Sequence, residues 1–167
     1  GYTTTNTASE THGVHAFDLK AKTKTLLKPD AVPAFDTESP ESTAGHMARS
    51  SDGRTLLQGG LGFRARLWRL DGTAPRCVTS FQPEWFEPML VDLSPSSGWA
   101  LVACGQRVEL WQLHLDQAYP ARCASRLTGV PRNSFVMGVR FGANGKTALA
   151  ATDEGELLTW DLSRLVQ

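Results

Sequence analysis

The stretch LLTWDLSRL, residues 157–165, decides how this chain is interpreted, because an apolar run ends there in a Trp-Asp pair. Weaker versions of the same phrase occur earlier in the chain, as VHAFDL at 14–19, ARLWRL at 65–70 and VELWQL at 108–113. Their aromatic residues are spaced by 51, 43 and 49 residues along the chain and are Phe17, Trp68, Trp111 and Trp160. Regular self-similarity of this length is typical of a protein built from repeated supersecondary units.

The last repeat shows the plan of one unit most clearly. Residues 135–142 (FVMGVRFG) alternate apolar and polar side chains, which predicts a half-buried strand. The turn at 143–146 contains Asn-Gly, the pair best suited to a tight hairpin. Small apolar residues follow at 147–152 (TALAAT), and we expect them to form a strand packed between neighbouring sheets. After a second turn at 153–156, the stretch 157–163 completes a three-stranded antiparallel meander.

The earlier repeats follow the same plan. Turns are expected at Asp52-Gly53, at Gly60–Phe63, at Pro95–Gly98 and at Gly105-Gln106. A fourth strand follows the aromatic phrase in three units, at 23–28, 76–81 and 121–127. The first unit begins with its second strand at 2–7, and the last stops after its third. We therefore expect sheets of three, four, four and three strands, about fourteen strands in all.

These units resemble WD40 repeats, in which Phe-Ser-Pro-Asp-Gly, a small-residue strand and Val-Arg-Leu-Trp-Asp follow in that order. Residues 145–161 carry the most specific part of the resemblance. It implies an all-β fold of WD40-like β-propeller blades, each a four-stranded antiparallel sheet. In the family, an Asp in the second turn and an Asp after the Trp belong to a structural hydrogen-bond network. Only the last unit has both, as Asp153 and Asp161.

The repeats divide the chain into five segments. We expect a partial blade at 1–28, a long exposed loop at 29–44, blades at 45–81 and 88–127, and an incomplete last blade at 134–167. The loop segment holds three prolines and an acidic excess, which disfavour packing.

About three to four blades make an incomplete ring, because propellers of the WD40 type usually have about seven. Such an arc leaves the apolar faces of its terminal blades and the edges of its strands uncovered. We therefore expect a C-terminal half-propeller of a larger protein, completed by another segment of the same polypeptide or by a separate chain. Homodimerisation of two half-rings and a small closed four-bladed ring are the alternatives.

The composition favours protein partners over nucleic acid or membranes. With 17 basic and 17 acidic residues, the chain gives no electrostatic reason to bind nucleic acid or an anionic membrane. No apolar window is long enough for a membrane span. The three cysteines, an odd number without a CxxC pair, favour buried or partly buried thiols in a reducing, cytoplasmic compartment. A disulfide or a reactive thiol is the alternative.

The sequence offers no constellation that predicts catalysis. Its four histidines are scattered over different units, and no nucleophile-elbow or phosphate-binding motif occurs. We therefore expect no enzyme activity in this chain, no metal ion and no cofactor. Pairing with turn amides explains Asp153 and Asp161 without a catalytic role. A catalytic propeller with an active site in its central channel remains the alternative, and a purely structural half-ring is a third possibility.

The function that the resemblance implies is a protein-interaction or regulatory scaffold, which binds a partner or controls an attached effector domain. Adjacent aromatics in the inter-blade stretch QPEWFEP (82–88) suggest a binding anchor, unless the loop folds them back onto the ring. Basic residues in two further loops could also contact a partner, but a solvated surface explains them equally well. The candidate recognition residues are Trp85, Phe86, Arg64 and Arg132. The repeat-position residues Trp68, Trp111 and Trp160 are expected to fill the space between blades.

Overall fold

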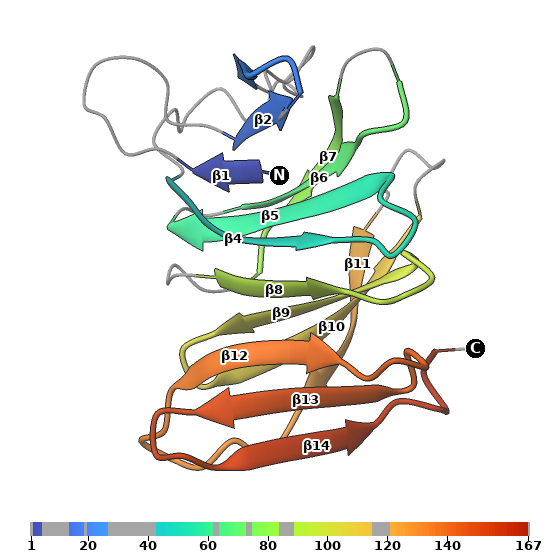
Figure 1. Ribbon diagram of the computed structural model, residues 1–167. Helices are drawn as coiled ribbons and strands as arrows, with labels where there is room; N and C mark the ends of the chain where they lie inside the picture. Colours follow the sequence, from blue (N-terminus) through green and yellow to red (C-terminus); the bar gives the residue numbers. More distant parts are fainter. Residues whose placement is uncertain are drawn as a thin grey trace.

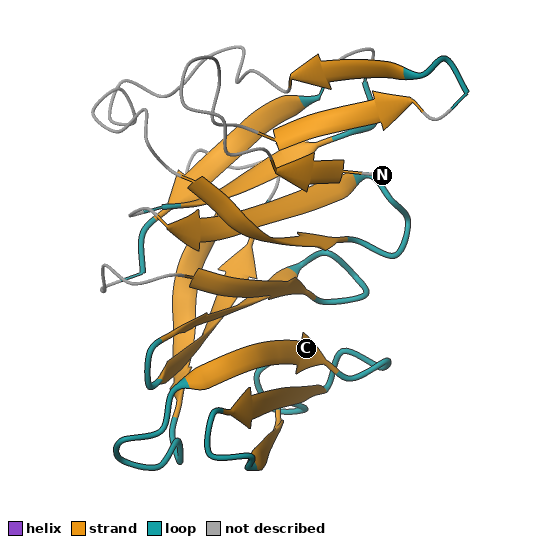
Figure 2. Cartoon of the chain, turned by 60° about the vertical axis from the view of Figure 1, so that its left-hand side comes forward, coloured by secondary structure: helices purple, strands orange, loops and turns teal. Residues whose placement is uncertain are grey.

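The structure is a computed structural model that describes residues 2–4, 14–18, 20–26, 43–61, 64–72, 75–83, 89–114 and 121–166. Every regular element in these ranges is a β-strand, and no helix occurs among them (Figure 2). The fourteen strands are β1 (Tyr2–Thr4), β2 (Val14–Asp18), β3 (Thr23–Leu26), β4 (Thr43–Arg49), β5 (Thr55–Leu61), β6 (Ala65–Arg69), β7 (Arg76–Phe81), β8 (Met89–Leu93), β9 (Trp99–Cys104), β10 (Arg107–Leu113), β11 (Ala121–Leu127), β12 (Val136–Phe141), β13 (Thr147–Thr152) and β14 (Leu157–Asp161).

The strands form antiparallel sheets in which sequence neighbours pair (Figure 1). We call β1–β3 the first sheet, β4–β7 the second, β8–β11 the third and β12–β14 the fourth. The predicted all-β fold and the grouping into three, four, four and three strands are confirmed. For the first sheet only the backbone pairing is described, so the side chain of Phe17 lies outside the described part.

Local chemistry fixes the turns between the first and second strands of the sheets. Gly53 and Gly145 adopt positive φ angles of 74° and 69°, which glycine reaches without strain. In the turn of the second sheet, the carboxylate of Asp52 accepts hydrogen bonds from the Ser50 hydroxyl, at 2.6 Å, and from the Arg54 amide, at 2.9 Å. These hydrogen bonds hold the pKa of Asp52 below its ordinary value. The turns expected at 52–53, 95–98, 105–106, 143–146 and 153–156 all occur.

The second, third and fourth sheets are stacked face to face (Figure 1). Their first strands β4, β8 and β12 lie next to one another in that order, with β8 between the other two. The turns that follow these strands are also in contact. The Ser51 hydroxyl donates to the Pro95 carbonyl at 2.9 Å, and a Cβ added to Gly145 would lie 3.3 Å from Cδ of Pro95. The stack is therefore continuous from one sheet to the next.

A buried cluster joins the second sheet to the third. The ring of Phe81 lies 4.6 Å from that of Trp111, centroid to centroid, at an interplanar angle of 33°. The other side chains come from alternate positions of the facing strands, as expected for sheets with one set of side chains on each face. They are Ala48, Leu57, Ala65 and Leu67 from the second sheet and Met89, Val91, Leu93, Ala100, Val102, Cys104 and Leu113 from the third.

A second cluster joins the third sheet to the fourth. Its buried members are Leu101, Ala103, Val108, Leu110 and Leu127 from the third sheet, and Val136, Val139, Ala148, Ala150 and the adjacent Leu162 from the fourth. The half-buried Trp160 packs against them. Because one cluster lies on each of its faces, the third sheet is covered on both sides, and five of the six residues of β9 are buried.

The repeat-position tryptophans each use their indole N–H in a hydrogen bond. Trp68 donates to the Gln58 side chain at 3.0 Å, and Trp111 donates to the Glu109 carboxylate at 2.9 Å. Trp160 donates to the backbone carbonyl of Thr128 at 2.7 Å. Trp68 and Trp111 are buried and Trp160 is half-buried, so these rings supply apolar contact while their polar atom stays paired.

Because β5 lies close to β8 at Gly59, we expect a larger residue at this position to destabilise the protein. A Cβ at this position would lie 2.7 Å from Cγ1 of Val91 and 2.8 Å from the carbonyl oxygen of Met89. We expect Gly59→Ala to lower the free energy of unfolding by about 1–3 kcal/mol, because the two sheets must move apart to admit the methyl group. Denaturant unfolding of the two proteins measures this difference.

Gly138→Ala in β12 is the matched control, since a Cβ there meets nothing within 4 Å. Its free energy of unfolding should stay within about 0.5 kcal/mol of the parent value. Equal effects of the two substitutions would contradict the close packing of β5 on β8.

Candidate functional site

Equivalent positions recur on one face of each stacked sheet. When the sheets are aligned on their tryptophans, two residues of the second strand and two of the third lie on the same face. In the second and third sheets, this face packs against the following sheet. We call this the leading face of a sheet, and the opposite side its trailing face. The leading-face residues are Leu57, Gly59, Ala65 and Leu67 in the second sheet, Leu101, Ala103, Val108 and Leu110 in the third, and Leu149, Ala151, Leu157 and Thr159 in the fourth.

The leading face of the fourth sheet is uncovered in the described part of the chain. Its equivalents in the third sheet are buried, with Leu101 and Leu110 at 0% exposure. In the fourth sheet, by contrast, Leu157 is 69% exposed, and Ala151 and Thr159 are exposed as well. We call this surface, with Arg140 of β12 beside it, the open face. It is built like a core surface and carries apolar side chains in contact with solvent.

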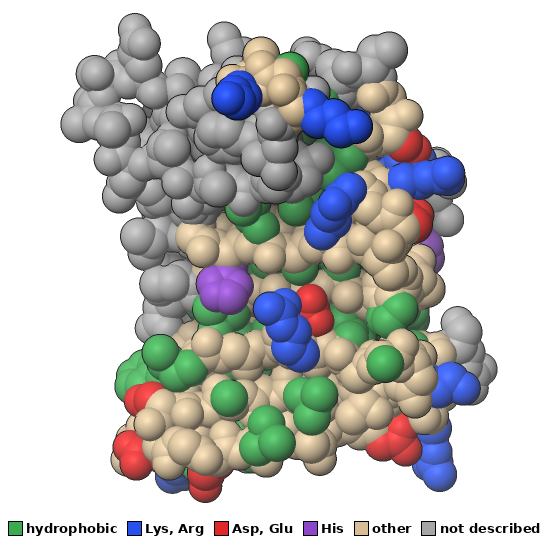
Figure 3. Space-filling view, viewed as in Figure 1, with side chains coloured by type: hydrophobic (Ala, Val, Ile, Leu, Met, Phe, Trp, Pro, Cys, Tyr) green, Lys and Arg blue, Asp and Glu red, His purple; other side chains and the backbone are tan. Residues whose placement is uncertain are grey.

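The space-filling view shows the same surface from outside. Hydrophobic side chains gather over the lower part of the molecule, where Figure 1 places the fourth sheet (Figure 3). Met137, at a β-bulge in β12, adds a further apolar side chain and is 63% exposed. The open face is therefore part of a larger apolar surface on the fourth sheet.

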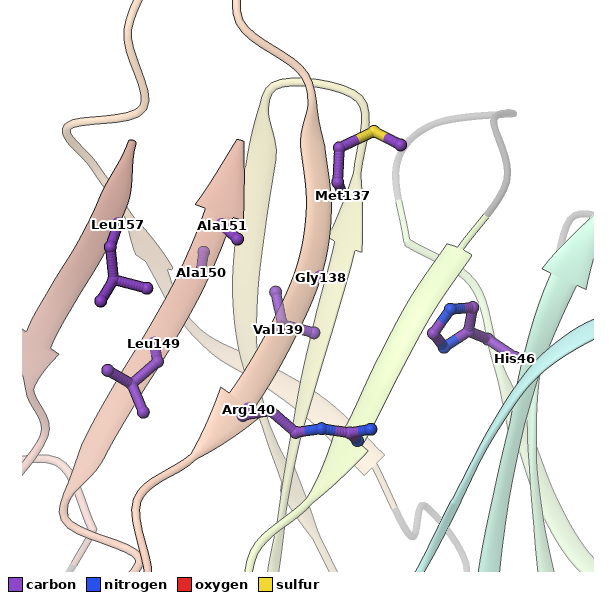
Figure 4. A pocket seen from close by; sticks show the side chains of 9 residues that line it. All are labelled: His46, Met137, Gly138, Val139, Arg140, Leu149, Ala150, Ala151 and Leu157. Carbon is purple, nitrogen blue, oxygen red and sulfur yellow. The ribbon is translucent and has the colours of Figure 1, made fainter. Parts of the chain in front are cut away.

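A shallow hollow of about 450 Å³ lies on this surface (Figure 4). Met137, Leu149 and Leu157 supply much of its apolar lining, and Arg140 lies at its side. His46 reaches the hollow from β4 in the second sheet, across β8 (Figure 4). The hollow therefore extends from the open face onto the surface formed by the first strands of the sheets.

A carboxylate connects the third and fourth sheets beside this hollow. The Asp92 carboxylate in β8 accepts a hydrogen bond from the backbone amide of Phe141 at 2.7 Å. It also accepts one from Nη1 of Arg140 at 3.1 Å. The side chain of Arg140 is 65% exposed, whereas that of Asp92 is 14% exposed. The hydrogen bond from the Phe141 amide to Asp92 therefore contributes more to stability than the exposed ion pair with Arg140.

Asp153 and Asp161 both bind backbone amides of the fourth sheet and its turns. The Asp153 carboxylate accepts from the Phe135 amide at 2.7 Å, while the Asp153 amide donates to the Phe135 carbonyl at 2.9 Å. The Asp161 carboxylate accepts from the Ser163 amide at 2.9 Å. Hydrogen bonds from the side chain and amide of Ser163 lower the pKa of Asp161. Both carboxylates are thus engaged with the backbone.

The recognition residues expected from the sequence do not form one site in the described part. Trp85 and Phe86 lie outside the described residues. Arg64 is half-buried directly before β6 of the second sheet, and Arg132 is exposed in the turn before β12. Arg64 thus precedes a strand of the second sheet, whereas Arg132 belongs to the connection between the third and fourth sheets.

The cysteines differ in burial. Cys104 is buried and Cys77 is half-buried, as expected from the sequence, whereas Cys123 in β11 is exposed, so the expectation is wrong for this thiol. Within the ranges that the structure describes, no three His, Cys, Asp or Glu side chains are grouped so that they could hold a metal ion. Nor does any helix suited to crossing a membrane occur in those ranges.

No protein-family model matches the sequence. The candidate surface is therefore argued from its geometry alone. Sequence reasoning predicted an uncovered terminal face but did not name its residues, because it expected both faces of 147–152 to be packed. The structure shows that only alternate residues of β13, Ala148, Ala150 and Thr152, are buried. The residues of 147–152 are nearly all small and apolar, so the sequence itself carries no signal that distinguishes the buried positions from the others.

The Asp92 connection predicts how the fourth sheet is held. Replacing Asp92 with Ala leaves the Phe141 amide without its acceptor, and we expect the free energy of unfolding to fall by about 1–3 kcal/mol. Asp92→Asn keeps an acceptor oxygen and should cost less. Hydrogen exchange at the Phe141 amide, together with denaturant unfolding, measures both effects.

Arg140→Ala is the control, because it removes only the exposed partner of Asp92. It should change the free energy of unfolding by about 0–1 kcal/mol. If Arg140→Ala lowers the free energy of unfolding as much as Asp92→Ala does, the ion pair, and not the hydrogen bond from the Phe141 amide, joins the two sheets.

Proposed function

We propose that this chain is a protein-interaction module, built as an arc of WD40-like β-propeller blades. Three features support the proposal. The sheets follow the repeat of the sequence, they stack face to face, and their first strands lie side by side (Figure 1). The chain binds a protein partner, or an attached effector domain, and serves as the scaffold that holds it.

The open face is the observation that carries this proposal. Contiguous apolar surface on a soluble domain commonly marks an interaction site. Covering a leucine side chain such as Leu157 contributes about 1.5–3 kcal/mol, and Leu149, Ala151 and Met137 lie on the same surface. The equivalent leucines of the second and third sheets show that this arrangement of residues packs against protein.

A charge on the open face should abolish partner binding without unfolding the chain. We expect Leu157→Asp to keep the parent thermal stability, because this side chain is already exposed. Affinity capture from an extract of the source cells, quantified by mass spectrometry, should lose at least one protein that the parent chain retains.

Ala124→Asp is the matched control, since it introduces the same charge at an exposed position of β11, the outer strand of the third sheet. This variant should retain the same proteins as the parent. If all three chains capture the same set in the same amounts, the open face is not a binding surface and the proposed function is wrong.

A further inference from the structure

We infer that the partner of the open face is another antiparallel β-sheet of the same repeat, carried by a separate segment of protein. This sheet packs face to face on the fourth sheet, with its first strand beside β12. The inference rests on the proposed function and names the kind of partner that the surface accepts.

The chain itself covers a leading face with a sheet of this kind twice. The third sheet covers the second, and the fourth covers the third. The two covering surfaces share a pattern, which is a valine in the first strand, an alanine and a further small apolar residue in the second, and a tryptophan in the third. These residues are Val91, Ala100, Val102 and Trp111 in the third sheet and Val139, Ala148, Ala150 and Trp160 in the fourth.

The residues of the open face match the surfaces that such a sheet covers. Leu149 stands where the third sheet has Leu101, Ala151 where it has Ala103, and Leu157 where it has Val108. Only Thr159 departs from the apolar pattern. Three of the four positions therefore carry the kind of residue found on a surface that already receives a sheet.

Ala151, the small residue of this set, leaves room for a strand to pack closely against β13. At the equivalent position of the second sheet, Gly59 lies so close to β8 that an added Cβ would be 2.8 Å from the Met89 carbonyl oxygen. Ala151 keeps a small side chain at the same place. An incoming first strand can thus approach β13 with its backbone, as sheets packed face to face require.

Arg140 adds a polar requirement on the partner. On the third sheet the corresponding position is Asp92, whose carboxylate accepts the Phe141 amide of the next sheet. The fourth sheet offers a guanidinium there, which can only donate hydrogen bonds. The first strand of the partner should therefore present a carbonyl or carboxylate oxygen toward Arg140.

A second copy of this chain does not offer the required surface in its described part. The trailing face of the second sheet is already buried, with Leu56 at 2% and Trp68 at 3% exposure. The trailing faces of the third and fourth sheets are covered as well, as Ala100 and Ala148 show at 0%. A copy would have to separate its second, third or fourth sheet from the stack to fill the open face with a sheet whose side chains the structure describes. We therefore assign the partner sheet to other protein.

A tandem protein tests whether a sheet of this repeat seats on the open face. Leu162 corresponds to Leu113, so residues 114–167 can be repeated directly after Leu162. Leu157→Cys in the original sheet, in a background where every Cys123 is replaced by Ser, reports the exposure of the face to a thiol reagent. We expect the labelling rate at position 157 to fall about tenfold or more relative to the parent chain with the same reporter.

Ala124→Cys in the original β11, in the same background, should label at equal rates in the two proteins, because this exposed position lies on the outer strand of the third sheet. Ala151→Asp in the original sheet should restore fast labelling at position 157. Unchanged labelling of the tandem protein, with or without Ala151→Asp, overturns the inference.

Photocrosslinking gives a second test that needs no added repeat. A benzoylphenylalanine at position 157 should attach to captured protein at a segment with small apolar residues in alternation. Attachment to a helical segment overturns the inference. So does a dimer of the parent chain that Leu157→Asp dissociates in light scattering, although that result leaves the proposed function standing. The proposed function fails only if Leu157→Asp changes no captured protein.

Discussion

The packing of one sheet's leading face against the next sheet is the interaction on which the rest of the structure depends. Most backbone hydrogen bonds join strands within a sheet, although the Val136 amide of the fourth sheet donates to the Gly105 carbonyl of the third at 2.8 Å. Few polar contacts cross between sheets, such as the Ser51–Pro95 and Asp92–Phe141 hydrogen bonds. Fully buried leucines, including Leu57 and Leu101 at 0% exposure, supply most of the attachment, each contributing about 1.5–3 kcal/mol. Any sheet that lacks a successor must therefore expose such residues.

Most of the secondary structure could be predicted because its determinants are local. Alternating side chains and tight-turn residues gave the strands at 76–81 and 121–127 with the bounds that the structure shows. Turn residues such as Gly53 and Gly145 adopt the backbone conformation that glycine permits. The order of strands within each sheet followed as well, since short turns can only join antiparallel neighbours. What local patterns do not contain is the distance and coverage between one sheet and the next.

The candidate site illustrates this limit. Ala103 and Ala151 occupy equivalent positions in β9 and β13 within similar apolar runs, yet one is buried and the other is exposed. The difference arises from the sheet that covers β9, not from the residues themselves. The sequence consequently predicts binding residues in loops, such as Trp85 and Phe86, because loop residues are usually exposed. For Leu157, the sequence predicts only a position in the last strand.

Repeated sheets that contact only their neighbours have stabilities that add along the stack. In the described part, the third sheet has a neighbour on each face, whereas the fourth packs through its trailing face alone. The fourth sheet thus gains less from packing than the third, although the hydrogen bonds of Asp92 and Asp153 help to order it. A protein that covers the open face binds the folded fourth sheet and not its unfolded state, so it stabilises that sheet by mass action. Under the proposed function, partner binding and the order of the last repeat are coupled through the same leucine and alanine side chains.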